Sequence, residues 1–100
     1  MKGYTSFTTA MAAMVGLTRN LALEVGSQGV RVNMIAPGFT ATGESEYAPL
    51  YVRKNIIEQT PMKRLATPKD IANAVIFLAS DLSRFTTGSY LVIDGGVVML

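Results

Sequence analysis

The feature that most constrains this chain is an apolar stretch that stops at a proline and a glycine. Residues 30–36 read Val-Arg-Val-Asn-Met-Ile-Ala, and they predict a strand whose two faces are both largely apolar. Such a strand is typical of a parallel sheet that is covered by helices on each side. Pro37 has no N–H to donate to a ladder and ends the strand, while Gly38 permits a backbone angle or a close approach that a side chain would forbid. We therefore expect any ligand to bind where this strand ends.

Length and composition limit the kinds of protein that the chain can be. One hundred residues form at most one domain, and the 49% of hydrophobic residues predict a rather core-rich globular protein. The chain has neither cysteine nor histidine, which excludes a disulfide framework, a Ser-His-Asp triad and the usual metal ligand. A net charge of +2 with scattered basic residues argues against nucleic acid. We therefore expect neither a metal site nor a nucleic-acid partner.

The apolar segments are too short to suggest a membrane protein. The candidate for a secretory signal near the N-terminus spans only residues 10–17, and no cleavage site of small residues follows it. No apolar run approaches the roughly 20 residues that a membrane-spanning helix needs. We therefore expect no membrane partner and a cytoplasmic location.

The segment before the strand predicts an amphipathic helix from about Phe7 to Val25. Thr5 or Ser6 can cap its N-terminus, and Gly26 supplies its C-terminal stop. Spacings of three and four residues define the apolar stripe, which comprises Phe7, Met11, Met14, Leu17 or Thr18, Leu21 and Val25. A second face carries the small residues Ala12, Gly16 and Asn20. Small residues allow another backbone to approach closely, which fits either packing on the chain's own sheet or contact between subunits.

The rest of the chain predicts two more helices and one more strand. Pro49 can open a short helix in a long excursion after the first strand, and such excursions are commonly lids over a site. Thr67, Pro68 and Asp70 form a strong start for the next helix. Residues 89–93 form a second short apolar strand. Strands separated by helices pair in parallel, so the predicted fold is α/β, one part of a doubly wound parallel sheet.

Several segments of the chain resemble the short-chain dehydrogenase/reductase family, in the order and at the spacing that the family shows. The segments are Leu17–Glu24, Gly29–Gly38, Pro61–Ala72, Phe77–Asp81, Thr87–Gly88 and Val92–Gly96. The resemblance covers essentially the whole chain and corresponds to the C-terminal half of a typical member. It implies that residues 1–100 are the C-terminal part of a Rossmann-like sheet. The glycine-rich turn that binds the pyrophosphate would belong to a strand–helix unit upstream of residue 1.

The resemblance also implies a cofactor and a set of binding residues. Members of the family bind NAD(H) or NADP(H) and move a hydride between the nicotinamide and a carbonyl or alcohol. By resemblance, Pro37 and Gly38 line the nicotinamide side of the pocket. The backbone near Thr40 and the hydroxyl of Thr42 would meet the carboxamide. This assignment agrees with the rule that ligands lie at the carboxyl ends of parallel strands.

The catalytic pair of the family is replaced in this chain. The resemblance implies a Tyr-x-x-x-Lys pair on the helix before the strand, in which the tyrosine transfers the proton and the lysine holds the nicotinamide ribose. Without gaps, these positions fall on Phe7 and Met11, which offer no proton and no charge. Tyr4 is an alternative acid, because its spacing from Met11 matches that of enoyl reductase relatives. Tyr4 otherwise fits a helix-entry residue with a packed ring and a hydroxyl in water.

Two functional hypotheses follow from these residues. The first is the family's NAD(P)-dependent hydride transfer to or from a small-molecule carbonyl or alcohol, in which this chain is not catalytic alone. The second is a pseudoenzyme that serves as a structural or partner subunit of a homo- or hetero-oligomer. The small-residue helix face and the apolar tail at residues 97–100 fit an oligomer, which the resemblance also implies. We assign no catalytic residue.

Overall fold

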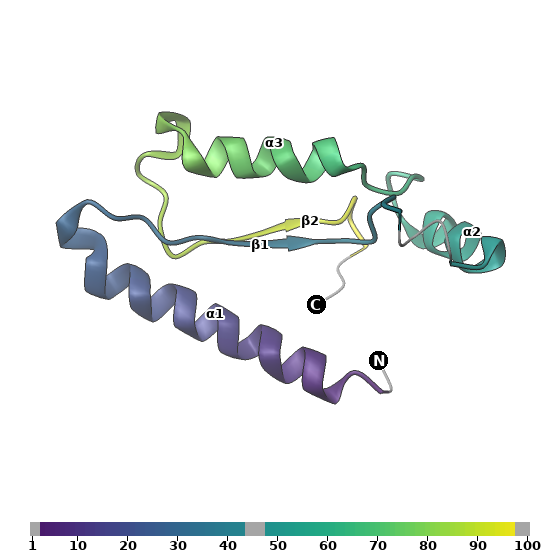
Figure 1. The fold of residues 1–100 in the computed structure, drawn as a ribbon, viewed down its shortest axis with the longest axis horizontal. Coiled ribbons are helices and arrows are strands. Elements are labelled where there is room, and N and C mark those ends of the chain that lie inside the picture. The colour runs from purple at the N-terminus through teal and green to yellow at the C-terminus, as the bar shows by residue number, and fades with distance from the viewer. Residues whose placement is uncertain (1–2, 44–47, 98–100) are drawn as a thin grey trace.

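The computed structural model describes residues 3–43 and 48–97. In chain order the elements are α1 (Thr5–Val25), the 3-10 turn η1 (Gly26–Gln28), β1 (Met34–Pro37), α2 (Leu50–Gln59), α3 (Pro68–Ala79), the 3-10 turn η3 (Asp81–Ser83) and β2 (Tyr90–Ile93). The two strands lie between α1 and α3, and α2 lies beyond their carboxyl ends (Figure 1). This arrangement of helices around parallel strands confirms the predicted α/β class.

β1 and β2 form a two-stranded parallel sheet. The register runs from the Met34–Tyr90 pair to the Pro37–Ile93 pair. The N–H groups of Met34 and Gly38 donate across the sheet at 2.9 and 2.8 Å. Because such donors alternate along a parallel strand, the Pro37 nitrogen points away from β2. Proline is therefore accepted as the last residue of β1, so the strand ends at Pro37 and Gly38 as predicted, one residue beyond the predicted last position, Ala36.

The first strand also begins later than predicted. Residues 30–33 lie opposite a turn instead of a strand, so their hydrogen bonds are irregular. The Val32 N–H donates to the Thr87 hydroxyl at 3.0 Å, and the Gly88 N–H donates to the Val32 carbonyl at 2.7 Å. The Thr87 hydroxyl replaces a backbone acceptor here, and Gly88 is left-handed with φ of 70°. These two features prevent regular pairing before Met34.

Helix α1 begins earlier than predicted and ends at the predicted residue. Tyr4 occupies the N-cap position without a side-chain capping hydrogen bond, and Thr5 and Ser6 lie inside the first turn. Gly26 keeps a right-handed conformation and opens η1, whereas Gly29 is left-handed with φ of 77°. The predicted cap is therefore wrong, whereas the α-helix ends at Val25 with Gly26 as its C-cap, as predicted. Thr5 is already helical, which prevents capping, and the added 3-10 turn delays the reversal to Gly29.

The face of α1 that packs on the sheet centres on Thr18 and Ala22, both of which are buried. Of the two alternatives in the predicted stripe, Thr18 faces inward, and Leu17 is 56% exposed. The Thr18 hydroxyl donates to the Met14 carbonyl at 2.8 Å, which satisfies it within the helix. Phe7, Met14 and Leu21 remain exposed to different degrees, so the predicted stripe is only partly covered. The small-residue face (Ala12, Gly16, Asn20) is exposed.

Helix α3 starts as its sequence predicts. Thr67 and Asp70 form a reciprocal capping box, in which the Thr67 hydroxyl accepts the Asp70 N–H and the Asp70 carboxylate accepts the Thr67 N–H. Pro68 occupies the first helical turn, where a missing N–H costs nothing. Pro49 takes the N-cap position of α2 without a side-chain capping hydrogen bond, so the helix opens directly after it. The predicted helix start is therefore confirmed at α3, where the signal lies within four consecutive residues.

The apolar core is small. Among the described residues, only Ala22, Met34 and Ala36 are buried apolar residues, while large apolar side chains such as Ile76 and Leu82 are exposed. The expectation of a rich core from composition is not met, because two strands offer too little sheet surface to cover the helices on both faces. No helix in residues 3–43 or 48–97 is long and apolar enough to cross a membrane. Residues 98–100 of the apolar tail lie outside the described residues.

Candidate functional site

The two strands converge at their carboxyl ends through Gly38. A Cβ at this position would lie 2.8 Å from both Cα and Cβ of Asp94, and 3.4 Å from the Ile93 carbonyl oxygen. Real Cβ atoms do not approach backbone atoms so closely. The sequence left two reasons for a glycine at position 38, an unusual backbone angle and a close approach. The structure shows the close approach. The loop after β1 can pass directly over the end of β2 because no side chain separates them.

The loop that follows is fixed by a single bridge to the segment before α3. Thr40 bridges Ala66, with the Ala41 N–H donating to the Ala66 carbonyl at 2.8 Å and the Ala66 N–H donating to the Phe39 carbonyl at 3.2 Å. The Thr40 hydroxyl donates to the Gly38 carbonyl at 3.0 Å. In this geometry the Thr40 N–H points away from Ala66, and it has no partner among the described residues. It is a backbone donor that a ligand at the strand end could use.

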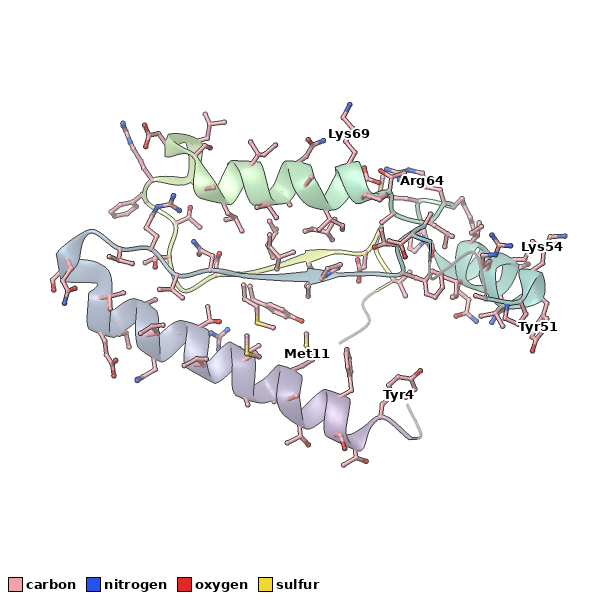
Figure 2. The ribbon with its side chains drawn as sticks, viewed as in Figure 1. Tyr4, Met11, Tyr51, Lys54, Arg64 and Lys69 are labelled. Carbon is pink, nitrogen blue, oxygen red and sulfur yellow. The ribbon has the colours of Figure 1, made fainter. Side chains whose placement is uncertain are left out.

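The structure brings Phe7, Met11 and Pro37 onto one hollow between α1 and β1, which we call the α1–β1 hollow. Its volume is about 470 Å³, and its further lining comprises Met14, Thr18 and residues 33–36. Figure 2 shows Met11 directed from α1 toward the strands. The positions that the resemblance assigns to the catalytic tyrosine and lysine therefore face the end of β1. Neither side chain supplies a proton or a charge there.

The polar groups of the α1–β1 hollow are engaged within the chain. The Thr18 hydroxyl bonds to its own helix, as described above. The Asn33 amide donates to the Thr86 carbonyl at 3.1 Å, and its oxygen accepts from the Ser89 N–H and hydroxyl at 3.1 and 2.7 Å. The wall that would face a nicotinamide fits that group, since Thr40 offers an N–H. The wall that would face the ribose does not, since the Met11 thioether carries no charge and is only a weak hydrogen-bond acceptor.

A second and larger cavity lies at the carboxyl ends of both strands, and we call it the strand-end cavity. Its volume is about 680 Å³. Its apolar lining comprises Phe39, Val52, Ile56, Met62, Ala66, Ile93 and Val97, and its polar lining includes Tyr4, Gln59, Thr60, Arg64, Asp70 and Asp94. The predicted lid helix supplies Val52 and Ile56. Met62, Ile93 and Val97 were not foreseen, because they come from separate segments that only the fold brings together.

Tyr4, at the N-cap of α1, and Phe7, in the first turn of this helix, line different spaces. Tyr4 lines the strand-end cavity, and Phe7 lines the α1–β1 hollow. Their ring centroids are 6.1 Å apart in an edge-to-face arrangement, with the planes at 86°. Figure 2 shows Tyr4 at the first turn of α1. The two candidates for the acid position, Phe7 and Tyr4, therefore line two separate spaces.

An ion pair stands at the rim of the strand-end cavity. Arg64 Nη1 lies 2.6 Å from Asp70 Oδ2, and a second contact joins Nη2 and Oδ1 at 3.3 Å. The hydrogen bond from Arg64, followed by those from the Thr67 N–H and hydroxyl, holds the pKa of the Asp70 carboxyl well below its usual range. The same pairing raises the pKa of Arg64. The two charges neutralise each other at this rim.

Comparisons with known proteins agree with this geometry. The family described as Enoyl-(Acyl carrier protein) reductase matches residues 1–98. The chain is 36% identical to 3-oxoacyl-[acyl-carrier-protein] reductase FabG of Thermotoga maritima over 97 residues, which are 97% of the chain and 39% of that protein.

Solved structures give the same answer. The 3-oxoacyl-[acyl-carrier protein] reductase of Brucella melitensis superposes with a TM-score of 0.85 at 36% identity, over 89% of this chain and 33% of that one. A 4-hydroxyisoleucine dehydrogenase complexed with NADH superposes with a TM-score of 0.80 at 37% identity, over 87% and 37%. The chain thus spans about two fifths of the length of these relatives or less.

Proposed function

The chain belongs to the short-chain dehydrogenase/reductase family, and from this premise we propose that it supplies the nicotinamide-facing wall of an NAD(P)-dependent oxidoreductase fold without transferring hydride alone. The observation that carries this proposal is the composition of the α1–β1 hollow. Phe7 and Met11, which the resemblance assigns to the positions of the family's tyrosine and lysine, line this hollow beside Pro37. We further propose that residues 1–100 are the C-terminal part of a Rossmann-like domain.

Pro37, Gly38, Thr40 and Thr42 are the residues proposed to meet the cofactor. When bound, NAD(P)H supplies a hydride for addition to a carbonyl. Pro37 forms the apolar end of the wall, and Gly38 keeps the loop close to β2. The Thr40 N–H and the Thr42 hydroxyl would meet the carboxamide. The Thr42 N–H donates to the Thr40 carbonyl at 2.9 Å, which closes the loop that holds both groups. The likeness to a dehydrogenase complexed with NADH supports this assignment.

The absence of catalysis follows from the chemistry of two side chains. Reduction of a carbonyl needs a proton donor beside the developing alkoxide, and a phenylalanine ring has none to give. The ribose needs a hydrogen-bonding or charged partner, and the Met11 thioether is only a weak acceptor. A small-molecule carbonyl or alcohol remains the proposed substrate of a family site that is completed elsewhere.

Reduced nicotinamide mononucleotide tests the wall, because it carries the nicotinamide and ribose without the adenosine half. In ¹⁵N-labelled protein we expect its addition to shift the amide signals of residues 38–42. We expect Thr42→Val to reduce these shifts and Thr9→Val, an exposed α1 change, to leave them unaltered. If residues 38–42 do not respond, the wall is wrongly assigned.

A double substitution tests the catalytic part. With NADPH and a simple ketone, we expect no turnover above the uncatalysed rate for the natural sequence. Phe7→Tyr with Met11→Lys should raise it, because these positions face the strand end. Thr8→Tyr with Ala12→Lys places the same side chains one residue further along, on an exposed face, and serves as the control. Turnover by the unaltered chain would contradict the proposed lack of catalysis.

The second candidate function is a structural subunit of an oligomer. It is favoured by the exposure of large apolar side chains, including Leu23 and Leu82, each 82% exposed. Sedimentation velocity over a hundredfold concentration range tests it. A discrete dimer or tetramer supports a subunit role, and a monomer or a continuous distribution of aggregates contradicts it.

A further inference from the structure

We propose that the α1–β1 hollow binds one soft monovalent metal cation, of the class of Cu(I), through the thioether sulfurs of Met11, Met14 and Met34. All three side chains line this hollow. The inference goes beyond the proposed function, because it involves neither a nicotinamide nor a substrate. It also departs from the expectation of no metal site, which rested on the lack of cysteine and histidine.

Two segments of the chain bring the three methionines to one space. Met11 and Met14 are three residues apart in α1, so they lie on the same face of the helix. Met34 is the first residue of β1 and is 8% exposed, so it forms the buried side of the hollow. Met14 is 47% exposed and leaves the hollow open to solvent. In Figure 2, Met11 and yellow sulfur atoms lie between α1 and the strands.

The openness of the hollow distinguishes these side chains from ordinary core methionines. Methionine often fills irregular gaps in a packed core, where its sulfur is surrounded by carbon atoms. Here the hollow keeps a volume of about 470 Å³, and Phe7 on the same lining is 50% exposed. The thioethers therefore border a space that an ion can enter.

The other side chains of the hollow offer little to a cation. The Thr18 hydroxyl donates to the Met14 carbonyl at 2.8 Å, and the Asn33 side-chain oxygen accepts both the N–H and the hydroxyl of Ser89. No side chain on the lining carries a charge. In residues 3–43 and 48–97, no group of three histidine, cysteine or acidic side chains could hold a metal ion. The sulfurs are therefore the ligands that remain.

The chemistry of these ligands selects the metal. Thioethers are soft ligands that favour Cu(I), whereas magnesium, calcium and manganese ions prefer oxygen ligands. A single charge suits a hollow without a carboxylate, because burying charge without a counter-charge is costly. The Phe7 ring on the same lining can add a cation–π contact. Because a thioether has no proton to lose, binding should not require deprotonation, unlike binding by a thiolate.

Ag(I) provides the test, since it shares the charge and the sulfur preference of Cu(I) and is stable in air. The full chain, labelled with [¹³C-methyl]methionine, is titrated with silver nitrate in a chloride-free buffer. We expect the methyl signals of Met11, Met14 and Met34 to shift together and to saturate at one ion per chain. Met62 is the internal control, because it is 64% exposed and lines the other cavity; its signal should shift only at higher silver concentration. Mg(II) should shift none of them.

Substitutions test the contribution of a single sulfur. Met14→Leu removes one ligand and nearly keeps the volume of the side chain. It should weaken silver binding by at least about tenfold, because even the outer partners of metal ligands contribute that much to affinity. Met62→Leu is the matched control and should leave the affinity unchanged, and circular dichroism verifies that both variants fold.

Two results would overturn the proposal. One is independent titration of the four methionines at similar silver concentrations, which would show only separate contacts with accessible sulfurs. The other is an unchanged affinity in a folded Met14→Leu variant. The methyl titration of the natural chain decides the question even if that variant does not fold. Binding that persists from pH 7 to pH 5 would further support thioether ligands over titratable ones.

Discussion

The two ends of the strand pair are built in opposite ways. At the amino ends, side chains hold the structure together. Arg31 Nη1 donates to the Ser83 hydroxyl at 3.0 Å and to the Thr86 carbonyl at 3.3 Å, while Nη2 donates to the Ser80 carbonyl at 3.3 Å. At the carboxyl ends, the close approach of the two strands depends on the missing side chain of Gly38.

The side chains have different tasks at the two ends. The Ser83 hydroxyl, in a residue that is 2% exposed, contacts the carbonyls of Phe77, Leu78 and Ser80, and with Arg31 it ties the end of α3 to the entry of β1. The carboxyl ends leave their side chains to line two spaces. The amino ends of the strands therefore carry the stabilising hydrogen bonds, and the carboxyl ends, only four residues away, line the candidate site. This division explains how so small a sheet can present a site.

The largest effect is expected from adding one methyl group at the carboxyl end. Gly38→Ala places a Cβ against the Asp94 backbone, so we expect the free energy of unfolding to fall by roughly 3 kcal/mol. Urea denaturation measures it. Gly16→Ala is the control, because nothing lies within 4 Å of its added Cβ and alanine favours the helix; it should stabilise the chain by roughly 0.5 kcal/mol or more. Equal effects at both glycines would show that the strand ends do not need this approach.

A smaller effect is expected from removing the side chain that holds the amino end. Arg31→Ala removes the charged donor of three hydrogen bonds, to the Ser83 hydroxyl and to the carbonyls of Ser80 and Thr86, and we expect a loss of about 2 kcal/mol. Hydrogen exchange should accelerate at the Met34 amide more than at the Gly38 amide. Arg19→Ala, on the exposed part of α1, should cost less than about 0.5 kcal/mol. Equal acceleration of exchange at both amides would show that the Arg31 hydrogen bonds do not stabilise the amino end separately.

The same contrast explains what the sequence could and could not predict. The start of α3 is encoded within Thr67–Asp70, so it was predicted correctly. The parallel pairing followed from the order of strands and helices. The hydrogen bonds of Arg31 were not foreseen, because its partners lie 49 to 55 residues away and no local feature distinguishes Arg31 from a surface arginine. Contacts that only the tertiary fold creates leave no periodic signal.

The candidate site divides in the same way. The end of β1 was identifiable, since a proline and a glycine after an apolar strand are local features. The separation of Tyr4 and Phe7 into two spaces was not, because it depends on where α2 and the end of β2 lie relative to the first turn of α1. Even the strand bounds shifted, since pairing with β2 decides where β1 begins.

The smallest effect is expected from the ion pair at the carboxyl end, and its removal tests whether this pair stabilises that end. Arg64 and Asp70 lie at the rim of the strand-end cavity, and an exposed pair of this kind contributes little to stability. Because the pKa of Asp70 is lowered in the folded state, its contribution is complete above the unfolded value of about 4 and is lost as the pH falls toward the folded value. Asp70→Asn preserves the shape and removes the charge.

We therefore expect Asp70→Asn to unfold at slightly lower urea concentration than the natural chain at pH 7, with a difference that shrinks below about pH 4. Lys69→Met is the control, since it removes a neighbouring charge whose ammonium group makes no hydrogen bond among the described residues (Figure 2). Its difference from the natural chain should not diminish in the same acidic range. If the Asp70→Asn difference is as large at pH 2.5 as at pH 7, the carboxylate charge does not stabilise this rim. The carboxyl end would then be stabilised by the close approach at Gly38 and the Thr40–Ala66 bridge without help from the ion pair. The amino end, by contrast, is stabilised by the side-chain hydrogen bonds of Arg31.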